Sequence, residues 1–168
     1  LAPGLQIPLR AERSNSGTVV SLIVDEHRQY LADDARVSAY REAIDEVVRL
    51  GDVVLDLGSG TGILGLLACR AGAARVYSIE QSGMIELARE IARANDFADR
   101  ITFIKDHSSR VELPEKVDVV ISDQIGRFGF EAGVVEFFDD ARRRFLKPGG
   151  VLVPRQIEIS VAPVEYAE

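Results

Sequence analysis

The sequence is poor in the residues that build disulfides and zinc sites. It has one cysteine, Cys69, and two histidines among 168 residues. A single cysteine excludes an intrachain disulfide framework and is compatible with a reducing compartment. Cys69 lies within "GLLACRAG", on the face of an expected helix, where a small core residue is a better interpretation than a nucleophile. Because no cluster has the spacing of a zinc site, we expect no metal centre.

Long apolar runs and an excess of basic residues are also missing. The sequence contains no run of about 18 apolar residues and no charged-then-apolar signal segment, so we expect a cytoplasmic protein without a membrane span. The 20 Lys and Arg residues are outnumbered by 27 Asp and Glu residues, a net charge of −7. This charge argues against a nucleic-acid-binding surface, although it is compatible with a cationic partner. The chain starts at Leu1 rather than Met, which is compatible with a piece of a longer protein.

Apolar runs alternate with stretches of helical spacing after an irregular arm over residues 1–18. An amphipathic helix is predicted through Val37, Tyr40, Ile44 and Val48. Further helices are predicted at residues 61–71, 82–96 (with Ser82 as N-cap) and 130–146, and strands at 53–57, 75–80, 101–105, 117–123, 151–154 and 157–165. Strands that alternate with helices through short links indicate one α/β domain, a mostly parallel sheet with helices on both faces.

The stretch "LDLGSGTGILG", residues 55–65, is a glycine-rich elbow directly after the first predicted strand. Such an elbow lets the backbone approach a bound nucleotide closely. Two motifs overlap in it. G-x-G-x-x-G starting at Gly60 is the dinucleotide fingerprint, and G-x-G-x-G starting at Gly58 suits another adenosine cofactor, so the two interpretations predict different enzymes.

Polar side chains follow four of the predicted strands at their carboxyl ends, where open α/β sheets bind ligands. Asp56 is in the first strand, Glu80 ends the second, Asp106 and His107 follow the third, and Asp123 ends the fourth. Glu80 lies 22 residues after Gly58, the position of an acid that accepts the hydroxyl groups of an adenosine ribose. Both cofactors carry that ribose.

The charge of Asp56 favours one of the two cofactors. A dinucleotide places its pyrophosphate, with about two negative charges, against the first loop, where a nearby carboxylate would repel it. S-adenosyl-L-methionine instead presents an ammonium and a sulfonium. Asp56 stands two residues before Gly58, so we favour S-adenosylmethionine. A second use of Asp56, bracing the loop by accepting backbone N–H groups, is compatible with either cofactor.

The stretch "VVLDLGSGTGILGLLACRAGAARVYSIEQS", with "YREAI" before it and "LKPGGVLVP" after it, resembles class I S-adenosylmethionine-dependent methyltransferases, and most closely protein arginine methyltransferases. The resemblance extends from about His27 to Val164. It implies the Rossmann-like class I methyltransferase fold, with residues 1–32 as an N-terminal arm and covering helix and residues 33–168 as the cofactor-binding domain. The β-barrel that follows this domain in the family is not part of this chain.

The resemblance also implies roles for the candidate cofactor-binding residues. Arg36 would bind the cofactor carboxylate, and His27 would line the same pocket. The methionine end and the ribose would contact Asp56, Gly58, Gly60 and Glu80. The adenine amine would meet Ser109, where the family usually has an acid, with help from backbone groups near Asp106 and His107.

The predicted acceptor site departs from the family. Arginine methyltransferases carry two glutamates after strand four, and this chain has "SDQIGRFGFEAG" there. Asp123 replaces the first glutamate. Without a gap the second position is Ala132, and with a one-residue shift it is Glu131. The resemblance therefore implies Asp123 and Glu131 as the acids that position a nitrogen acceptor. Gln124 replaces an aromatic residue, and Arg127 places a positive charge where a guanidinium would bind.

The motifs and the resemblance are compatible with three alternative functions. The first is a methyltransferase acting on a nitrogen acceptor, either protein arginine or a smaller amine. The second is a non-catalytic cofactor-binding domain descended from such an enzyme, and the third is an NAD-dependent oxidoreductase. Family members commonly pair head to tail through an arm that lies outside this sequence, so the resemblance leaves the oligomeric state open, with a homodimer as one alternative.

Overall fold

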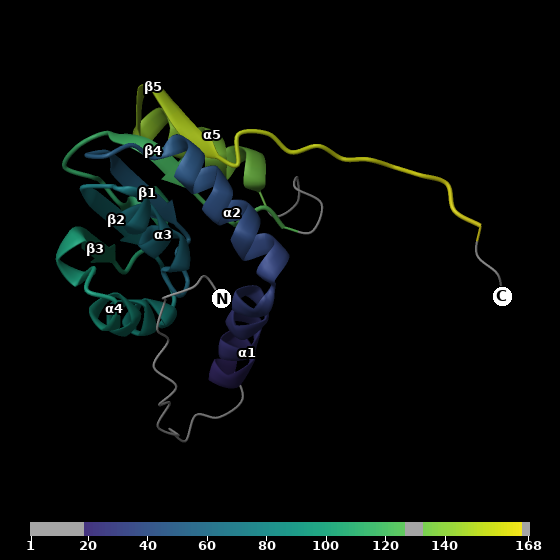
Figure 1. The fold of residues 1–168 in the computed structure, drawn as a ribbon, viewed down its shortest axis with the longest axis horizontal. Coiled ribbons are helices and arrows are strands. Elements are labelled where there is room, and N and C mark those ends of the chain that lie inside the picture. Colours follow the sequence, from purple (N-terminus) through teal and green to yellow (C-terminus); the bar gives the residue numbers. More distant parts are fainter. Residues whose placement is uncertain (1–18, 127–132, 166–168) are drawn as a thin grey trace.

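The computed structural model describes residues 19–126 and 133–165, and these residues build a five-stranded sheet with helices on both faces (Figure 1). The order of the strands is β3-β2-β1-β4-β5, and all four neighbouring pairs are parallel. The strands are β1 (Val53–Leu57), β2 (Arg75–Ile79), β3 (Ile101–Ile104), β4 (Val117–Ile121) and β5 (Leu146–Val153). The predicted α/β fold is confirmed.

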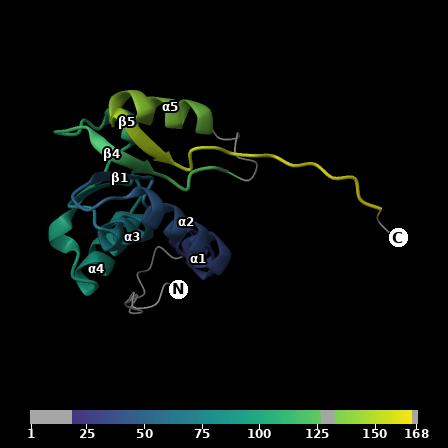
Figure 2. The same cartoon turned by 45° about the horizontal axis from the view of Figure 1, so that its top comes forward.

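The helices divide between the two faces of the sheet. They are α1 (Val19–Ala32), α2 (Asp34–Val47), α3 (Ile63–Ala71), α4 (Met84–Ala94) and α5 (Val134–Arg144), with 3₁₀ turns at Ala98–Arg100 and Ser108–Arg110. Figure 2 shows α5 on one face and α2, α3 and α4 on the other. Side chains alternate along β1 accordingly. Val54 packs with α2 and α3, whereas Leu55 and Leu57 pack with α5, so both faces of the strand are buried.

The order of the strands reverses between β1 and β4. The chain builds outward from β1 through β2 to β3, and then returns to add β4 and β5 on the other side. A sheet of this kind has its binding crevice at the carboxyl ends of the two strands that flank the reversal. We therefore looked for a site where β1 and β4 end.

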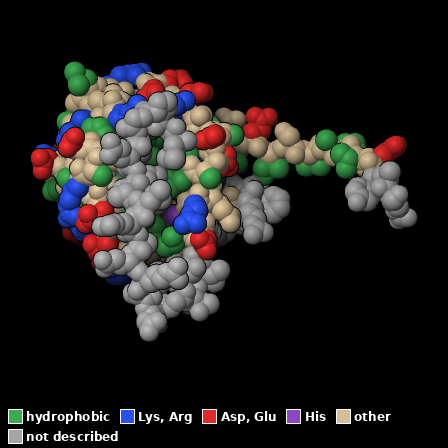
Figure 3. All heavy atoms as spheres, turned by 60° about the horizontal axis from the view of Figure 1, so that its bottom comes forward, with side chains coloured by type: hydrophobic (Ala, Val, Ile, Leu, Met, Phe, Trp, Pro, Cys, Tyr) green, Lys and Arg blue, Asp and Glu red, His purple; other side chains and the backbone are tan. Residues whose placement is uncertain are grey.

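Some predicted element boundaries are wrong. Residues 155–165 form no strand; they run away from the domain with Ile157, Ile159 and Val161 exposed (Figures 1 and 3). Alternating apolar residues indicate that a segment can form a strand, but a strand also needs a neighbour for its backbone hydrogen bonds. Helix α4 has Gly83 as its N-cap, not Ser82, although the Ser82 hydroxyl accepts a hydrogen bond from the Met84 N–H at 3.2 Å.

Three features that the composition bears on can be located in the structure: the cysteine, the surface charges and the length of the apolar helices. Cys69 is buried in the core between α3 and the sheet, as predicted. Figure 3 shows acidic and basic side chains intermixed on the face that it presents. Among the described helices, none is long and apolar enough to cross a membrane.

Candidate functional site

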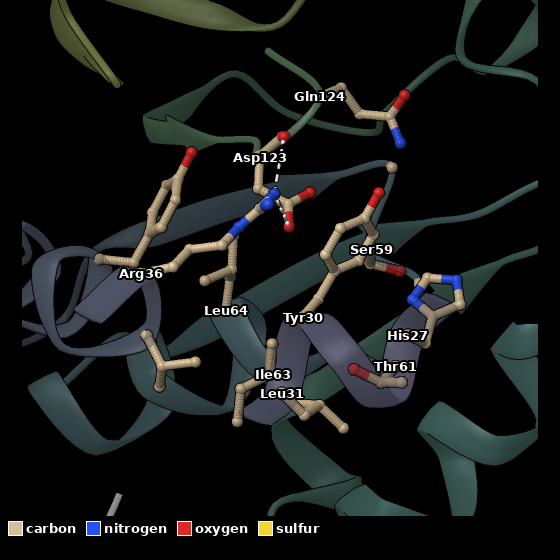
Figure 4. Close-up of a pocket in the computed structure, with 14 residues that line it drawn as sticks. His27, Tyr30, Leu31, Arg36, Ser59, Thr61, Ile63, Leu64, Asp123 and Gln124 are labelled. Carbon is tan, nitrogen blue, oxygen red and sulfur yellow. Dashed lines mark hydrogen bonds and ion pairs between the residues drawn. The ribbon is translucent and has the colours of Figure 1, made fainter. Parts of the chain in front are cut away.

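A cleft lies at the carboxyl ends of β1 and β4, under α1 and α2. The space in and directly over it amounts to about 570 Å³, a value that includes open solvent. Five of the predicted site residues line it: His27, Arg36, Gly58, Gly60 and Asp123. They come from α1, α2, the glycine-rich loop after β1 and the segment after β4 (Figure 4). Tertiary folding therefore brings together residues that are up to 96 positions apart in the chain.

The glycine-rich loop follows the edge of the cleft with a backbone that side chains would obstruct. Gly58 and Gly60 have φ values of +72° and +51°, in the left-handed region that favours glycine. A Cβ atom on Gly58 would lie 2.7 Å from Cγ of Gln124, and one on Gly60 would overlap the His27 imidazole. At both positions a Cβ atom would have to displace a neighbouring side chain, and the positive φ would add backbone strain.

Two buried carboxylates hold this loop in shape. One oxygen of Asp56 accepts the Gly65 N–H at 2.9 Å, which fixes the start of α3. Glu80 accepts the N–H groups of Gly60 at 3.0 Å and Ser82 at 2.6 Å. Asp56 is only 1% exposed, and this burial raises its pKa to about 8, although the Gly65 hydrogen bond opposes the change. The bracing use of Asp56, left open by the sequence, is the contact that the structure contains.

Part of the hydrogen-bonding capacity near the loop is unused. Oδ1 of Asp56, Oγ of Ser59 and Oγ of Ser78 are buried without a hydrogen-bond partner among the described residues. Asp56 and Ser78 are register partners on β1 and β2, and Ser59 lines the cleft. Leaving such a group unpaired costs about 1–3 kcal/mol, so a polar ligand that reaches Ser59 gains affinity. The donors and acceptors present therefore suit a polar ligand beside the loop.

Arg36 and Asp123 form an ion pair across the cleft. Nη2 of Arg36 donates to Oδ2 of Asp123 at 2.9 Å and to its backbone oxygen at 3.1 Å. About a quarter of each side chain is exposed, 27% and 26%. The residue predicted to bind the cofactor carboxylate thus contacts the residue predicted to position the acceptor, and their charges neutralise each other.

Two tyrosines that sequence reasoning missed also line the cleft. The ring of Tyr30 lies 4.5 Å from Cζ of Arg36 and packs edge to face with His27. Oη of Tyr40 donates to the Ser122 oxygen at 3.0 Å, and burial raises the pKa of this phenol. Helical spacing could have identified both, because Tyr30 is three residues after His27 and Tyr40 four after Arg36. Ser59, Thr61 and Gln124 also line the cleft without having been singled out as binding residues.

The residues predicted to contact adenine form a separate group after β3. The His107 N–H donates to Asp106 at 2.7 Å, and Nδ1 of His107 lies 2.8 Å from Oγ of Ser109. Arg110 pairs with Asp106 and lowers its pKa. None of these residues, nor Asp56 or Glu80, is among those that line the cleft. The predictions for Glu131 and Arg127 fall outside the described residues.

Comparison with known proteins decides the family. Residues 54–150 match the methyltransferase domain family. The chain belongs to this family. It is 42% identical over 139 residues to protein arginine N-methyltransferase PRMT10 of Oryza sativa subsp. japonica, covering 82% of this chain and 37% of that protein. It is 39% identical over 145 residues to protein arginine N-methyltransferase 1 of Schizosaccharomyces pombe, covering 84% and 43%.

Solved structures support the same assignment. Protein arginine methyltransferase 10 of Arabidopsis thaliana superposes with a TM-score of 0.72 at 35% identity, covering 76% of this chain and 37% of that one. The Trypanosoma brucei PRMT1 enzyme–prozyme complex with AdoHcy gives 0.71 at 35% identity, covering 75% and 40%. This methyltransferase domain therefore resembles arginine methyltransferases but spans only 37–43% of the length of these relatives. The methyltransferase interpretation of the glycine-rich loop is confirmed over the dinucleotide one.

Proposed function

We propose that this domain binds S-adenosylmethionine and transfers its methyl group to a nitrogen acceptor, either a protein arginine or a smaller amine. The observation that carries the proposal is the cleft itself: its lining combines the Arg36 guanidinium group with a loop in which a Cβ on Gly58 or Gly60 would collide with a neighbouring side chain. The family supports it, as does the solved relative that contains AdoHcy.

The residues of the cleft fit such a ligand. In the proposal, Arg36 pairs with the cofactor carboxylate, since guanidinium and carboxylate groups match in geometry. Gly58 and Gly60 let the backbone approach the ligand, and His27 closes the pocket from α1. Glu80 does not line the cleft, but in the proposal the ribose extends to it. Its two hydrogen bonds use only part of the capacity of a carboxylate, so lone pairs remain for the ribose hydroxyls.

The remaining predicted residues take supporting roles in the proposal. Asp56 shapes the loop through its hydrogen bond to the Gly65 N–H, and the cationic end of the ligand, when bound beside it, favours its charged form. Ser109 binds the adenine amine, together with backbone groups of Asp106 and His107.

S-adenosylmethionine, when bound, supplies an electrophilic methyl group on a sulfonium. Methyl transfer mainly requires alignment and charge complementarity at the acceptor nitrogen. We assign this task to Asp123, with Glu131 as the second acid. A homodimer also stays a prediction, which light scattering on the purified chain tests.

A second function, cofactor binding without catalysis, is favoured by one contact. The Asp123 carboxylate is already paired with Arg36 at 2.9 Å, and this pair must open, or share its hydrogen bonds, before Asp123 can hold an acceptor. A domain that never opens the pair would bind cofactor and transfer nothing.

Two measurements test the proposal. Calorimetry compares S-adenosylmethionine, S-adenosylhomocysteine and NAD as ligands; we expect the first two to bind, and binding of NAD alone would refute the cofactor assignment. Transfer of labelled methyl groups is then assayed with arginine-rich peptides and small amines. We expect Asp123→Asn to abolish most of the transfer, and the matched control Asp139→Asn, a partly exposed acid of α5, to retain it. Cofactor binding without transfer to any acceptor would favour the second function.

A further inference from the structure

Tyr30 connects the two elements that cover the cleft. It belongs to α1, and its ring lies against the guanidinium group of Arg36, which belongs to α2, at 4.5 Å. The same ring packs edge to face against His27, with centroids 6.0 Å apart. Figure 4 shows the ring lying within the cleft, beside the paired Arg36 and Asp123 side chains. One tyrosine therefore contacts both predicted cofactor-binding residues of the covering helices.

The contacts of Arg36 leave a defined part of its guanidinium group open. Cζ of Arg36 lies over the Tyr30 ring, and Asp123 accepts two hydrogen bonds from Nη2. Within the part of the chain that the structure describes, Nε and Nη1 have no hydrogen-bond partner. These groups keep N–H donors available for a ligand carboxylate.

We propose that Tyr30 is a positioning residue that holds the Arg36 guanidinium in place for the carboxylate of the cofactor. This inference rests on the proposed function. A free arginine side chain samples many rotamers, and ordering it on binding lowers affinity. A ring whose face lies against the guanidinium orders the side chain in advance, because the negative face of the aromatic ring attracts the cation. The gain in affinity should apply only to ligands that bind the Arg36 guanidinium.

Two ligands that differ in one group separate this role from ordinary helix packing. S-adenosylmethionine has the carboxylate, whereas decarboxylated S-adenosylmethionine keeps the adenosine, sulfonium and ammonium groups without it. Calorimetry on the 168-residue chain gives both dissociation constants. We expect Tyr30→Leu to weaken S-adenosylmethionine by about two- to fivefold, the range of an exposed cation–π contact, and to leave the decarboxylated ligand unchanged. Tyr30→Phe keeps the ring and should therefore lose much less affinity for S-adenosylmethionine than Tyr30→Leu.

A double-mutant cycle shows whether Tyr30 acts through Arg36. Arg36→Met removes the guanidinium, so adding Tyr30→Leu to it should have no further effect on S-adenosylmethionine binding. Thermal unfolding of each variant reports on folding. If Tyr30→Leu lowers the unfolding temperature, Tyr30→Gln, which is compatible with an exposed helical position, repeats the test.

Several outcomes overturn the inference. An equal loss of affinity for both ligands means that Tyr30 only packs α1 against the domain. Additive effects in the cycle mean that Tyr30 contacts the ligand directly, and no effect of Tyr30→Leu means that the stacking is unimportant. If the wild type binds neither ligand, the proposed function itself fails and this inference fails with it. If the wild type binds S-adenosylmethionine and one of the other outcomes is found, only the role of Tyr30 is refuted and the proposed function stands.

Discussion

The buried Asp56 carboxyl should make the domain less stable as the pH rises. Its pKa increases from an ordinary value of 3.8 to about 8 in the folded protein, chiefly because burial disfavours the charged form. An acid with a higher pKa in the folded state binds more protons when folded than when unfolded. Its contribution to stability is therefore complete below the unfolded pKa and is lost as the pH rises through 3.8 towards about 8.

The expected size of this effect is large enough to measure. Between the two pKa values, the free energy of unfolding falls by at most about 1.4 kcal/mol for each pH unit. From about pH 5 to about pH 8 the upper limit is therefore roughly 4 kcal/mol, a large part of the 5–15 kcal/mol that stabilises a typical domain.

Urea denaturation at several pH values tests this for the wild type and for Asp56→Asn. The asparagine amide oxygen can still accept the Gly65 N–H, so the variant removes the ionisation with little change in shape. Because all other ionisable groups are common to the two proteins, the difference between the two curves isolates Asp56. We expect Asp56→Asn to gain stability relative to the wild type as the pH rises, and the control Asp139→Asn to follow the wild type. Parallel curves for the wild type and Asp56→Asn would refute the reasoning.

Three other substitutions test the glycine-rich loop, the hydrogen bond of Tyr40 and the packing of β5 against β4. Gly60→Ala places a methyl group against the His27 imidazole at a position with a positive φ, so we expect calorimetry to show weaker S-adenosylmethionine binding. The control is Gly83→Ala, which has open space around its Cβ and should bind as the wild type does. Tyr40→Phe removes the hydrogen bond to the Ser122 oxygen and should lower the free energy of unfolding in urea by about 1 kcal/mol. Gly150→Ala puts a Cβ 2.8 Å from a backbone oxygen of β4, and we expect the free energy of unfolding in urea to fall by about 1–3 kcal/mol. Gly83→Ala is again the control. An unchanged urea midpoint for Gly150→Ala would mean that the strand relaxes freely.

Much of the fold could be predicted from the sequence because its signals are local. The run Val53–Leu57 followed by glycines identifies a buried strand and its elbow, and the spacing of Val37, Tyr40 and Ile44 identifies the face of α2 that packs on the sheet. Since parallel strands end at one edge, the sequence also predicted which edge carries the polar residues. Residues 157–165 have the alternating pattern of a strand but form none. A strand also needs a neighbouring strand for its backbone hydrogen bonds, and the pattern does not show whether one is present.

The sequence by itself determined the α/β class, the glycine-rich elbow and the set of strand ends from which a site could be built, since each depends on residues close together in the chain. Only the tertiary structure decided how those residues are used. It turned Asp56 and Glu80 towards backbone N–H groups, paired Arg36 with Asp123 across 87 positions, and placed Tyr30 on the guanidinium. A side chain's partner depends on where distant segments pack, and spacing along the chain carries no information about that.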